Sequence, residues 1–373
     1  MTQFPHIRVQ GTPAQRGRQL GQLAGRLIRR NIELYRDIFK HYAGWDWQRA
    51  TQHAARFRTH IGDYQPHYLT EIEGIAEGAG VDVNDVLALN VRTEIMFAAV
   101  ARQVAAECTS FAVLPDATTD GHTLIGQNWD WNPAMTETMI MLEVEQAEAP
   151  DFVTVVEAGL LAKVGFNSAG IGVATNALIS DQDRGEPGVP YHVILRGLLD
   201  AETMTQALAA INSQPRASSA NYLVAHCDGE AFDAETAPGN YTRVYSEFTP
   251  GDILAHTNHF VCRRFDLKDV GLWSGPDSPF RLTRLTRLLW DDEGDLSPQR
   301  LQVLLTDHFN RPHSICRHPD PTKPLLERYA TVASVIMDLN ARTMWLAEGN
   351  PCQVPYRELD YGAFLGGTPS GPA

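Results

Sequence analysis

Apolar residues recur at helical spacing through the first third of the chain. The stripe that follows Pro13 comprises Leu20, Leu23, Leu27, Leu34 and Ile38. Similar patterns predict further helices over residues 47–60, 68–79 and 83–101, the last capped by Asp82. Pro13 suits the first turn of a helix, because its missing N–H would be unpaired there anyway. The region before residue 108 is therefore predicted to be helical.

From residue 108 onward the apolar positions alternate with a period of two, which is typical of strands. Strands are predicted over 109–114, 123–129, 139–145, 152–157, 163–167, 172–176, 222–226, 231–235, 252–257, 334–339 and 343–347. Helices are predicted over 191–199, 203–211, 280–290 and 298–308. Turn sequences at 227–229 (CDG) and 340–342 (NAR) predict two hairpins. Strand sets interrupted by helices favour two stacked sheets with helices on both outer faces.

Composition narrows the class of protein. The 373 residues carry a formal charge of −14, which argues against nucleic-acid or anionic-membrane partners. The five cysteines are widely spaced and odd in number, so they indicate neither a disulfide framework nor a zinc ligand set. No secretory signal is visible, and the longest apolar run, 95–101, is too short to span a bilayer. A cytoplasmic protein without a metal is therefore expected.

Cys108 lies where the helical pattern changes to the strand pattern, in the sequence AAECTSFAV. A cysteine that opens a strand at such a junction suits an enzyme whose nucleophile becomes a new N-terminus by self-cleavage. The ordinary alternative is a half-buried strand cysteine that only contributes to packing.

Several common catalytic signatures are absent from the sequence, including zinc-protease, Walker-loop and Gly-x-Ser-x-Gly patterns. His256 and His259 would point to opposite faces of a strand, so they are not expected to share an ion. Arg281, Arg284 and Arg287 could bind an anionic cofactor, but a solvated helix face explains them more simply.

Short polar clusters stand out instead. They are 107–110 (ECTS), 126–130 (GQNWD), 164–170 (VGFNSAG), 256–259 (HTNH) and 314–317 (SICR). With 10–13 (QGTP), 73–76 (EGIA), 89–94 (LNVRTE) and 350–351 (NP), they occur in the order found in one family. The chain resembles the acyl-coenzyme A:6-aminopenicillanic acid acyltransferase family, also called isopenicillin N acyltransferases, within the N-terminal nucleophile (Ntn) hydrolases.

The resemblance implies an α+β fold, a four-layer αββα sandwich with mainly antiparallel sheets. It also implies self-cleavage between Glu107 and Cys108, which would give an α chain of 1–107 and a β chain of 108–373 within one structural domain. The freed α-amine of Cys108, with a pKa of about 7.7–8.0, could act as the base for its own thiol.

The same resemblance assigns roles to individual residues. Cys108 would be the nucleophile and the Asn258 side chain an oxyanion donor. Asp130 would orient the α-amine, and Arg317 would organise the nucleophile. Ser110, Trp131, Asn167 and Ser219 are weaker candidates for substrate binding, whereas Cys316 is expected to be structural.

Two positions depart from the best-known member of the family. That enzyme has glycine before its nucleophile, where this chain has Glu107. Glutamate lacks the backbone freedom of glycine and adds a negative charge that opposes formation of a thiolate. Trp131 also replaces a smaller aromatic residue, so a different acyl or amine pocket is expected.

The leading hypothesis is a self-processing enzyme that cleaves small N-acyl amides, or transfers their acyl group, through a Cys108 thioester. No cofactor is expected, although a coenzyme A thioester could donate the acyl group. The expected partners are the small amide or amine substrate and the chain's own two fragments, with a homo-oligomer left open. The alternatives are an acid-ceramidase-like lipid amidase and an uncleaved, non-enzymatic binding protein.

Overall fold

The structure, a computed structural model, describes residues 3–99, 107–239, 244–247, 252–263 and 266–366. Its helices before Cys108 are α1 Pro13–Ala43, α2 Trp47–Ala55, α3 Arg58–Tyr64, α4 Pro66–Ala79, α5 Val83–Asn90 and α6 Arg92–Ala99. Those after it are α7 Tyr191–Leu199, α8 Met204–Asn212, α9 Gly271–Ser274, α10 Ser278–Asp291, α11 Pro298–Leu304 and α12 Gly362–Leu365. Short 3₁₀ turns cover Pro115–Ala117, Pro133–Glu137 and Leu325–Glu327.

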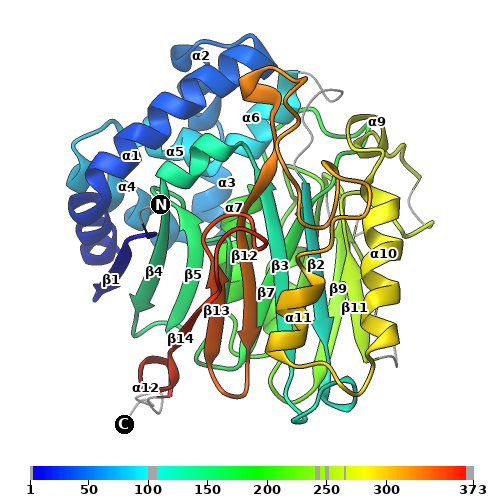
Figure 1. Cartoon of the computed structure of the whole chain (residues 1–373). Helices are drawn as coiled ribbons and strands as arrows, with labels where there is room; N and C mark the ends of the chain where they lie inside the picture. The colour runs from blue at the N-terminus through cyan, green and yellow to red at the C-terminus, as the bar shows by residue number, and fades with distance from the viewer. Residues whose placement is uncertain (1–2, 100–106, 240–243, 248–251, 264–265, 367–373) are drawn as a thin grey trace.

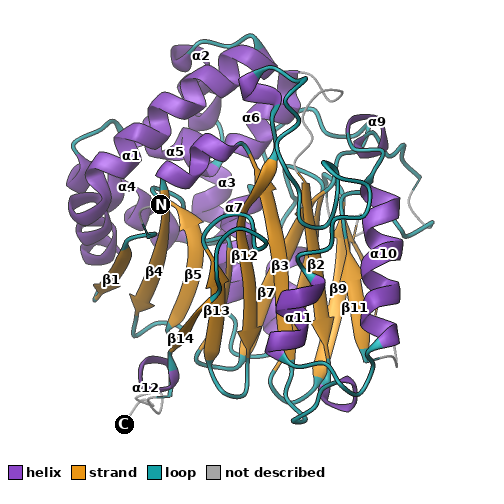
Figure 2. Cartoon of the chain, viewed as in Figure 1, coloured by secondary structure: helices purple, strands orange, loops and turns teal. Residues whose placement is uncertain are grey.

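The described strands form two sheets, shown in Figure 2. An eight-stranded sheet contains, in spatial order, β1 His6–Gln10, β4 Met139–Glu145, β5 Phe152–Glu157, β6 Val164–Asn167, β7 Ile171–Ala177, β8 Ala220–His226, β9 Glu230–Thr236 and β10 Val244–Glu247. A six-stranded sheet contains β11 Ile253–His256, β2 Glu107–Val113, β3 Leu124–Trp131, β12 Ala330–Asp338, β13 Thr343–Ala347 and β14 Arg357–Asp360. The β1–β4 pair is parallel and the other pairs in these sheets are antiparallel.

The two sheets face each other, with β2 and β3 packed against β7. Helices α7 and α8 contact the eight-stranded sheet, and α1 contacts its edge strand β1. Helices α10 and α11 contact the six-stranded sheet. In Figure 1 the N-terminal helices, blue to cyan, gather away from α10 and α11, which are drawn in yellow to orange. The predicted αββα sandwich with mainly antiparallel sheets is confirmed.

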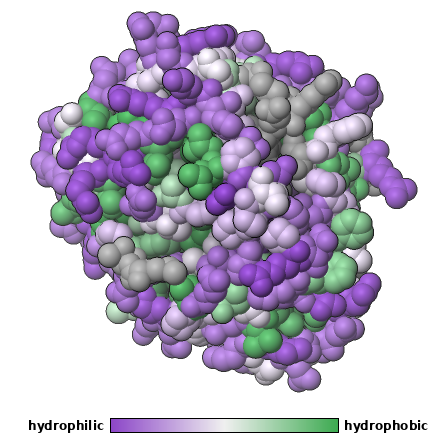
Figure 3. All heavy atoms as spheres, turned by 45° about the horizontal axis from the view of Figure 1, so that its top comes forward, coloured by the Kyte–Doolittle hydropathy of each residue, from purple (hydrophilic) through white to green (hydrophobic). Residues whose placement is uncertain are grey.

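The molecular surface matches the acidic, polar composition. On the face drawn in Figure 3, hydrophilic residues predominate and hydrophobic residues form small separate groups. Among the described residues, the helices are too short or too polar to cross a membrane.

Most predicted elements are present, but two predicted helices are each divided. The helix predicted over 47–60 breaks between α2 and α3, and the break turns Phe57 into the core, where it is fully buried. The helix predicted over 83–101 breaks between α5 and α6, where the Asn90 side chain donates a hydrogen bond to the Gly159 carbonyl (2.9 Å). Residues 100 and 101 of that prediction lie outside the described residues.

Other predictions differ at element edges. Leu23 is 63% exposed and does not belong to the buried stripe of α1. The predicted helix 298–308 ends at Leu304, so residues 305–308 belong to the following loop. The short edge strands β1, β10 and β14 were not predicted. Both predicted hairpins are confirmed, because β8 pairs with β9 and β12 pairs with β13 across the expected turns.

Glycines let α1 and α4 cross at close range. A Cβ added to Gly21 would meet the Ile75 carbonyl oxygen and would lie 2.6 Å from the backbone nitrogen of Ala79. The same added atom on Gly25, one turn later, would have its nearest neighbour at 3.4 Å. The backbone contact at Gly21 therefore excludes any side chain, whereas Gly25 has room for a methyl group.

This difference predicts opposite effects of the same substitution. Gly21→Ala should lower the free energy of unfolding by about 1–3 kcal/mol, because the two helix backbones must separate. Gly25→Ala, the matched control, should leave stability unchanged or raise it by up to about 1 kcal/mol through better helix propensity. Denaturant unfolding monitored by circular dichroism measures both. Equal stability of the two variants would contradict the close packing.

Candidate active site around Cys108

Cys108 lies near the start of β2, a strand in the interior of the six-stranded sheet. Successive strand residues face opposite sides of a sheet. Ser110 donates a hydrogen bond to Asn176 of β7 (2.6 Å), so Cys108 and Ser110 face the eight-stranded sheet. Thr109 faces the other way and accepts a hydrogen bond from Arg281 of α10 (2.9 Å). Cys108 itself is buried, with 3% of its surface exposed.

The backbone of Cys108 is held on both sides. Its N–H donates to Oδ1 of Asn258 (2.7 Å), and its carbonyl accepts from Nη1 of Arg281 (2.8 Å). Arg281 also donates to Oδ1 of Asn258 (3.0 Å), while Nδ2 of Asn258 donates to the Ala177 carbonyl (3.1 Å). Because two donors meet one side of the amide and an acceptor meets the other, its orientation is fixed. One of the two Nδ2 hydrogens of Asn258 is therefore bound to the Ala177 carbonyl.

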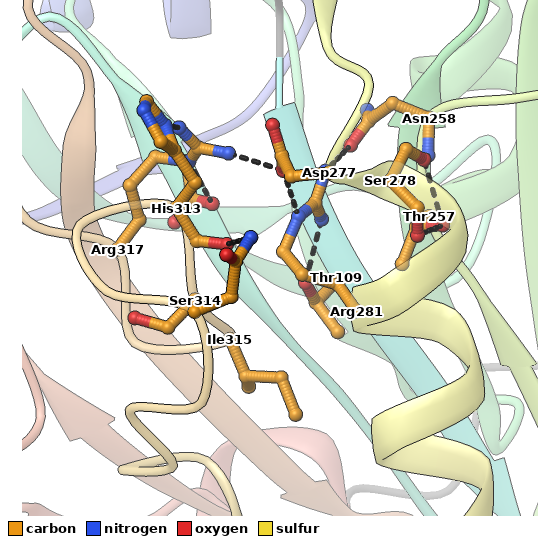
Figure 4. A network of polar contacts seen from close by, with 12 residues as sticks. Thr109, Thr257, Asn258, Asp277, Ser278, Arg281, His313, Ser314, Ile315 and Arg317 are labelled. Atoms are coloured by element: carbon orange, nitrogen blue, oxygen red, sulfur yellow. Dashed lines mark hydrogen bonds and ion pairs between the residues drawn. The ribbon is translucent and has the colours of Figure 1, made fainter. Parts of the chain in front are cut away.

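A row of alternating charges continues from Arg281, as Figure 4 shows for its central members. Asp277, four residues earlier, accepts from Nε of Arg281 (2.7 Å) and from Nη2 of Arg317 (2.5 Å). Nε of Arg317 lies 3.5 Å from Oδ2 of Asp130, whose Oδ1 accepts from Thr331 (2.7 Å). These arginines and aspartates are almost completely buried. Each buried charge thus has an opposite charge beside it, which limits the desolvation penalty.

Burial controls protonation in this cluster. It raises the pKa of the Cys108 thiol to about 11, although Lys163 acts in the opposite direction. It also raises the pKa of Asp130 to about 8 against the influence of Arg281. Burial lowers the pKa of Lys163 to about 7. At neutral pH the thiol of the continuous chain is therefore protonated, and a base must remove its proton before it can attack.

Lys163 and Tyr191 complete the surroundings of the thiol. Nζ of Lys163 donates to the Tyr191 hydroxyl (2.9 Å) and lies 5.3 Å from the centre of the Trp129 ring. With Cys108, Asp130 and nearby apolar groups they line a cavity of about 20 Å³. A space of that size holds about one water molecule, not a substrate.

The structure brings Cys108, Asp130, Asn258 and Arg317 together as one connected cluster. Trp131 lines the small cavity beside Cys108, and Ser110 lies on the same strand face. Their catalytic and binding roles stay predictions.

Asn167 and Ser219 make other contacts. Asn167 donates to the Leu199 and Ala201 carbonyls, and Ser219 donates to Asp183 (2.7 Å). These hydrogen bonds hold loops of the eight-stranded sheet. The structure gives these two side chains no contact with Cys108, so it does not support them as substrate contacts.

Sequence reasoning missed Arg281, Asp277 and Lys163. Arg281 was expected on a solvated helix face, but only 2% of it is exposed, so that expectation is wrong. A signal was present, because Arg281 precedes the buried Leu285 and Leu289 by four and eight residues. That spacing places it on the apolar face of α10. Asp277 at i−4 supplies the partner charge that makes this burial tolerable.

Comparison with known proteins identifies the family. Residues 117–353 match the family described as acyl-coenzyme A:6-aminopenicillanic acid acyl-transferase. The "acyl-coenzyme A:6-aminopenicillanic-acid-acyltransferase 40 kDa form" of Emericella nidulans is 30% identical over 93% of each chain. The protein belongs to this acyltransferase family. The matched region contains Asp130, Asn258 and Arg317, whereas Cys108 precedes it.

More distant similarities add little to this assignment. An uncharacterized protein of Archaeoglobus fulgidus is 21% identical over 75% of this chain and 52% of its own length. A mutant conjugated bile acid hydrolase from Clostridium perfringens aligns over 71% of this chain and 95% of its own, with a TM-score of 0.48 and 12% identity. Penicillin V acylase from Agrobacterium tumefaciens aligns over 68% and 86%, with a TM-score of 0.40 and 12% identity. At such scores the family assignment rests on the sequence matches.

A larger groove of about 500 Å³ is lined by Asp277 and Arg317 of the charged cluster. Its remaining lining comes from α9, α10 and the loops before β12, together with Tyr42 of α1. Trp273 and Phe280 are 84% and 59% exposed at this groove. The groove is therefore lined by the buried charged groups of Asp277 and Arg317 and bordered by the exposed apolar side chains of Trp273 and Phe280.

Arg281 offers a direct test of the cluster. Arg281→Lys should lower the turnover rate by about 10- to 100-fold, because one ammonium group cannot replace the guanidinium contacts to Cys108, Asn258 and Asp277. Arg287→Lys, on the exposed side of the same helix, is the control and should behave like the parent. Steady-state kinetics and melting temperatures of both variants give the answer. Equal turnover rates in the two variants would show that the hydrogen bond from Arg281 to the Cys108 carbonyl is not needed for catalysis.

Proposed function

We propose that this family member is a self-processing acyltransferase or amide hydrolase that carries its acyl group as a thioester on Cys108. The observation that carries the proposal is the pair of hydrogen bonds to the Cys108 backbone, from its N–H to Asn258 and from Arg281 to its carbonyl. A cysteine needed only for packing would not require a buried arginine on its carbonyl and an asparagine on its N–H. Such contacts suit a residue whose backbone position must stay fixed while its peptide bond is cut.

The first reaction would be self-cleavage. The Cys108 thiol attacks the Glu107 carbonyl carbon, its proton passes to the departing nitrogen, and the peptide becomes a thioester. Water then hydrolyses the thioester, which gives a carboxylate on residue 107 and a free thiol and α-amine on Cys108. The chains formed would be 1–107 and 108–373. Enclosure of the thiol beside a cavity of about 20 Å³ fits a precursor whose site opens only after this cut.

The freed α-amine would then serve as the base of the working enzyme. Its nitrogen already lies 2.7 Å from Oδ1 of Asn258. An α-amine with a pKa of about 7.7–8.0 can accept the thiol proton near neutral pH. The buried Oδ2 of Asp130 accepts no hydrogen bond from the described residues, and a positive α-ammonium beside it would favour the ionised form of this carboxyl. Nucleophile and base would thus belong to the same residue.

Asn258 has two possible duties in this scheme. Its Oδ1 is placed to hold the α-amine, whereas its Nδ2 is bound to the Ala177 carbonyl. Nδ2 carries a second hydrogen, which could be donated to an oxyanion while the first stays on that carbonyl. We therefore infer that Asn258 positions the amine through Oδ1 and can serve the oxyanion through the second hydrogen of Nδ2.

The substrate would be a small N-acyl amide or an acyl thioester with an apolar acyl group. In acylation, the thiolate attacks the acyl carbonyl and the amine or thiol leaves with the proton taken from Cys108. Water or a second amine then releases the acyl group, which makes the outcome hydrolysis or transfer. The apolar border formed by Trp273 and Phe280 supports an apolar acyl group and keeps a lipid amide as a second candidate substrate.

Variants of Cys108 test the proposed reaction. Cys108→Ala should abolish both self-cleavage and turnover of an N-acyl amide, because the attacking atom is gone. Cys108→Ser should keep some cleavage but lose at least about 100-fold in turnover, since a hydroxyl needs stronger base catalysis. Cys262→Ala is the matched control and should remain active.

The measurements are chromatographic product assays and mass spectrometry of enzyme quenched during turnover. An acyl adduct should appear on the fragment that contains Cys108 in the parent and in Cys262→Ala. Turnover by Cys108→Ala at the parent rate, or an adduct on another residue, would overturn the nucleophile assignment.

A further inference from the structure

Two histidines and two cysteines meet at one point outside the Cys108 site. His308, Cys316 and His318 come from the segment between α11 and β12, and Cys352 comes from the loop after β13. One ligand atom from each lies within 4.8 Å of every other. Segments that are distant in sequence therefore converge on a single small volume.

Four of the six distances between the ligand atoms are close to the edges of a tetrahedral metal site, and the other two are within 4.8 Å. Bonds of about 2.3 Å to sulfur and 2.0–2.1 Å to nitrogen give a tetrahedron with edges of about 3.8 Å (S···S), 3.3 Å (N···N) and 3.6 Å (S···N). The Cys316 and Cys352 sulfurs are 3.5 Å apart, and Nε2 of His308 and His318 are 3.0 Å apart. Nε2 of His318 lies 3.7 Å from the Cys316 sulfur and 3.4 Å from the Cys352 sulfur.

Hydrogen bonding alone explains this arrangement poorly. Nε2 of His318 carries either one proton or one lone pair, so it can form one good hydrogen bond. It nevertheless has three close polar neighbours, one nitrogen and two sulfurs. A cation at the centre would use every one of these atoms at once.

Neighbouring groups also suit a metal site. Nδ2 of Asn350 lies 3.7 Å from the Cys316 sulfur as a donor and also donates to the Arg317 carbonyl (2.5 Å). Such outer hydrogen bonds orient metal ligands and support the charge on a thiolate. Cys316 and His318 are buried, whereas His308 and Cys352 are exposed, which leaves the ion a route from solvent.

We propose that His308, Cys316, His318 and Cys352 bind a structural Zn²⁺ ion. Two thiolates and two neutral imidazoles in a tetrahedron form a ligand set that zinc favours, and the thiolates balance its charge. The protein supplies all four ligands, which is the pattern of structural sites, not of catalytic ones. The sequence-based expectation of a protein without a metal would then be wrong.

The position of the ion would connect it to the Cys108 site. Arg317 lies between the ligands Cys316 and His318, and its guanidinium contacts Asp277. Its own backbone carbonyl is bound by Asn350, two residues before the ligand Cys352. Zinc would therefore fix the backbone that carries Arg317, which makes all four ligands positioning residues for the charged cluster.

Metal content of the purified full-length protein tests the proposal without any substrate. Protein made in zinc-supplemented cells and dialysed free of loose metal should contain one zinc per chain by inductively coupled plasma mass spectrometry. Replacement by Co²⁺ should give the intense visible absorption of a tetrahedral thiolate site. Cys352→Ser should lose the zinc, and Cys262→Ser, the matched control, should keep it.

A second variant, His308→Ala, tests the same site independently in case Cys352→Ser does not fold. His308 is exposed, so His308→Ala should keep the circular dichroism of the parent while its zinc affinity, measured by chelator competition, falls at least tenfold. Parent protein without zinc, or a Cys316–Cys352 disulfide in its place, would overturn the proposal. So would unchanged zinc affinity in both Cys352→Ser and His308→Ala.

Discussion

The buried contact between Arg281 and the backbone of Cys108 is the constraint on which the site depends. An arginine in the interior must be paired on every side, and Asp277, Asn258 and the Cys108 carbonyl supply the partners. Removing any one of these partners would leave the buried charge or a buried hydrogen-bond donor of Arg281 without a partner. The start of β2 is therefore fixed by electrostatics as well as by its pairing with β3.

The fold brings these partners from distant parts of the chain. On the outer face of the six-stranded sheet, α10 carries Arg281 and the residue just before this helix is Asp277, while Arg317 lies in the loop before β12. On the inner face, Lys163 approaches the thiol from the eight-stranded sheet. Cys108 thus lies between the charged cluster on the outer side and Lys163 on the inner side. Burial keeps the thiol protonated at neutral pH, and in the proposed reaction the freed α-amine would remove its proton.

Sequence patterns predicted the layers well because alternating and helical spacing report burial directly. They failed where a side chain changed the expected path, as at Asn90, whose hydrogen bond to Gly159 accompanies a helix break. Asp130, Asn258 and Arg317 could be proposed only through family resemblance, whereas Cys108 also stood out by its place where the helical pattern changes to the strand pattern. Arg281 was missed because its charge was taken as a sign of exposure, although its spacing to Leu285 and Leu289 and its pairing with Asp277 at i−4 both agree with burial. The His/Cys cluster was missed because its ligands do not follow a short regular spacing.

The central claim is that cutting the backbone before Cys108 creates the working base. N-terminal sequencing and intact mass of the fully active wild-type protein test it most directly. The account predicts two chains that stay associated, with cysteine 108 as the first residue of the larger one and its α-amine free. Full activity in a single continuous chain, with residue 107 still joined to the cysteine, would contradict it.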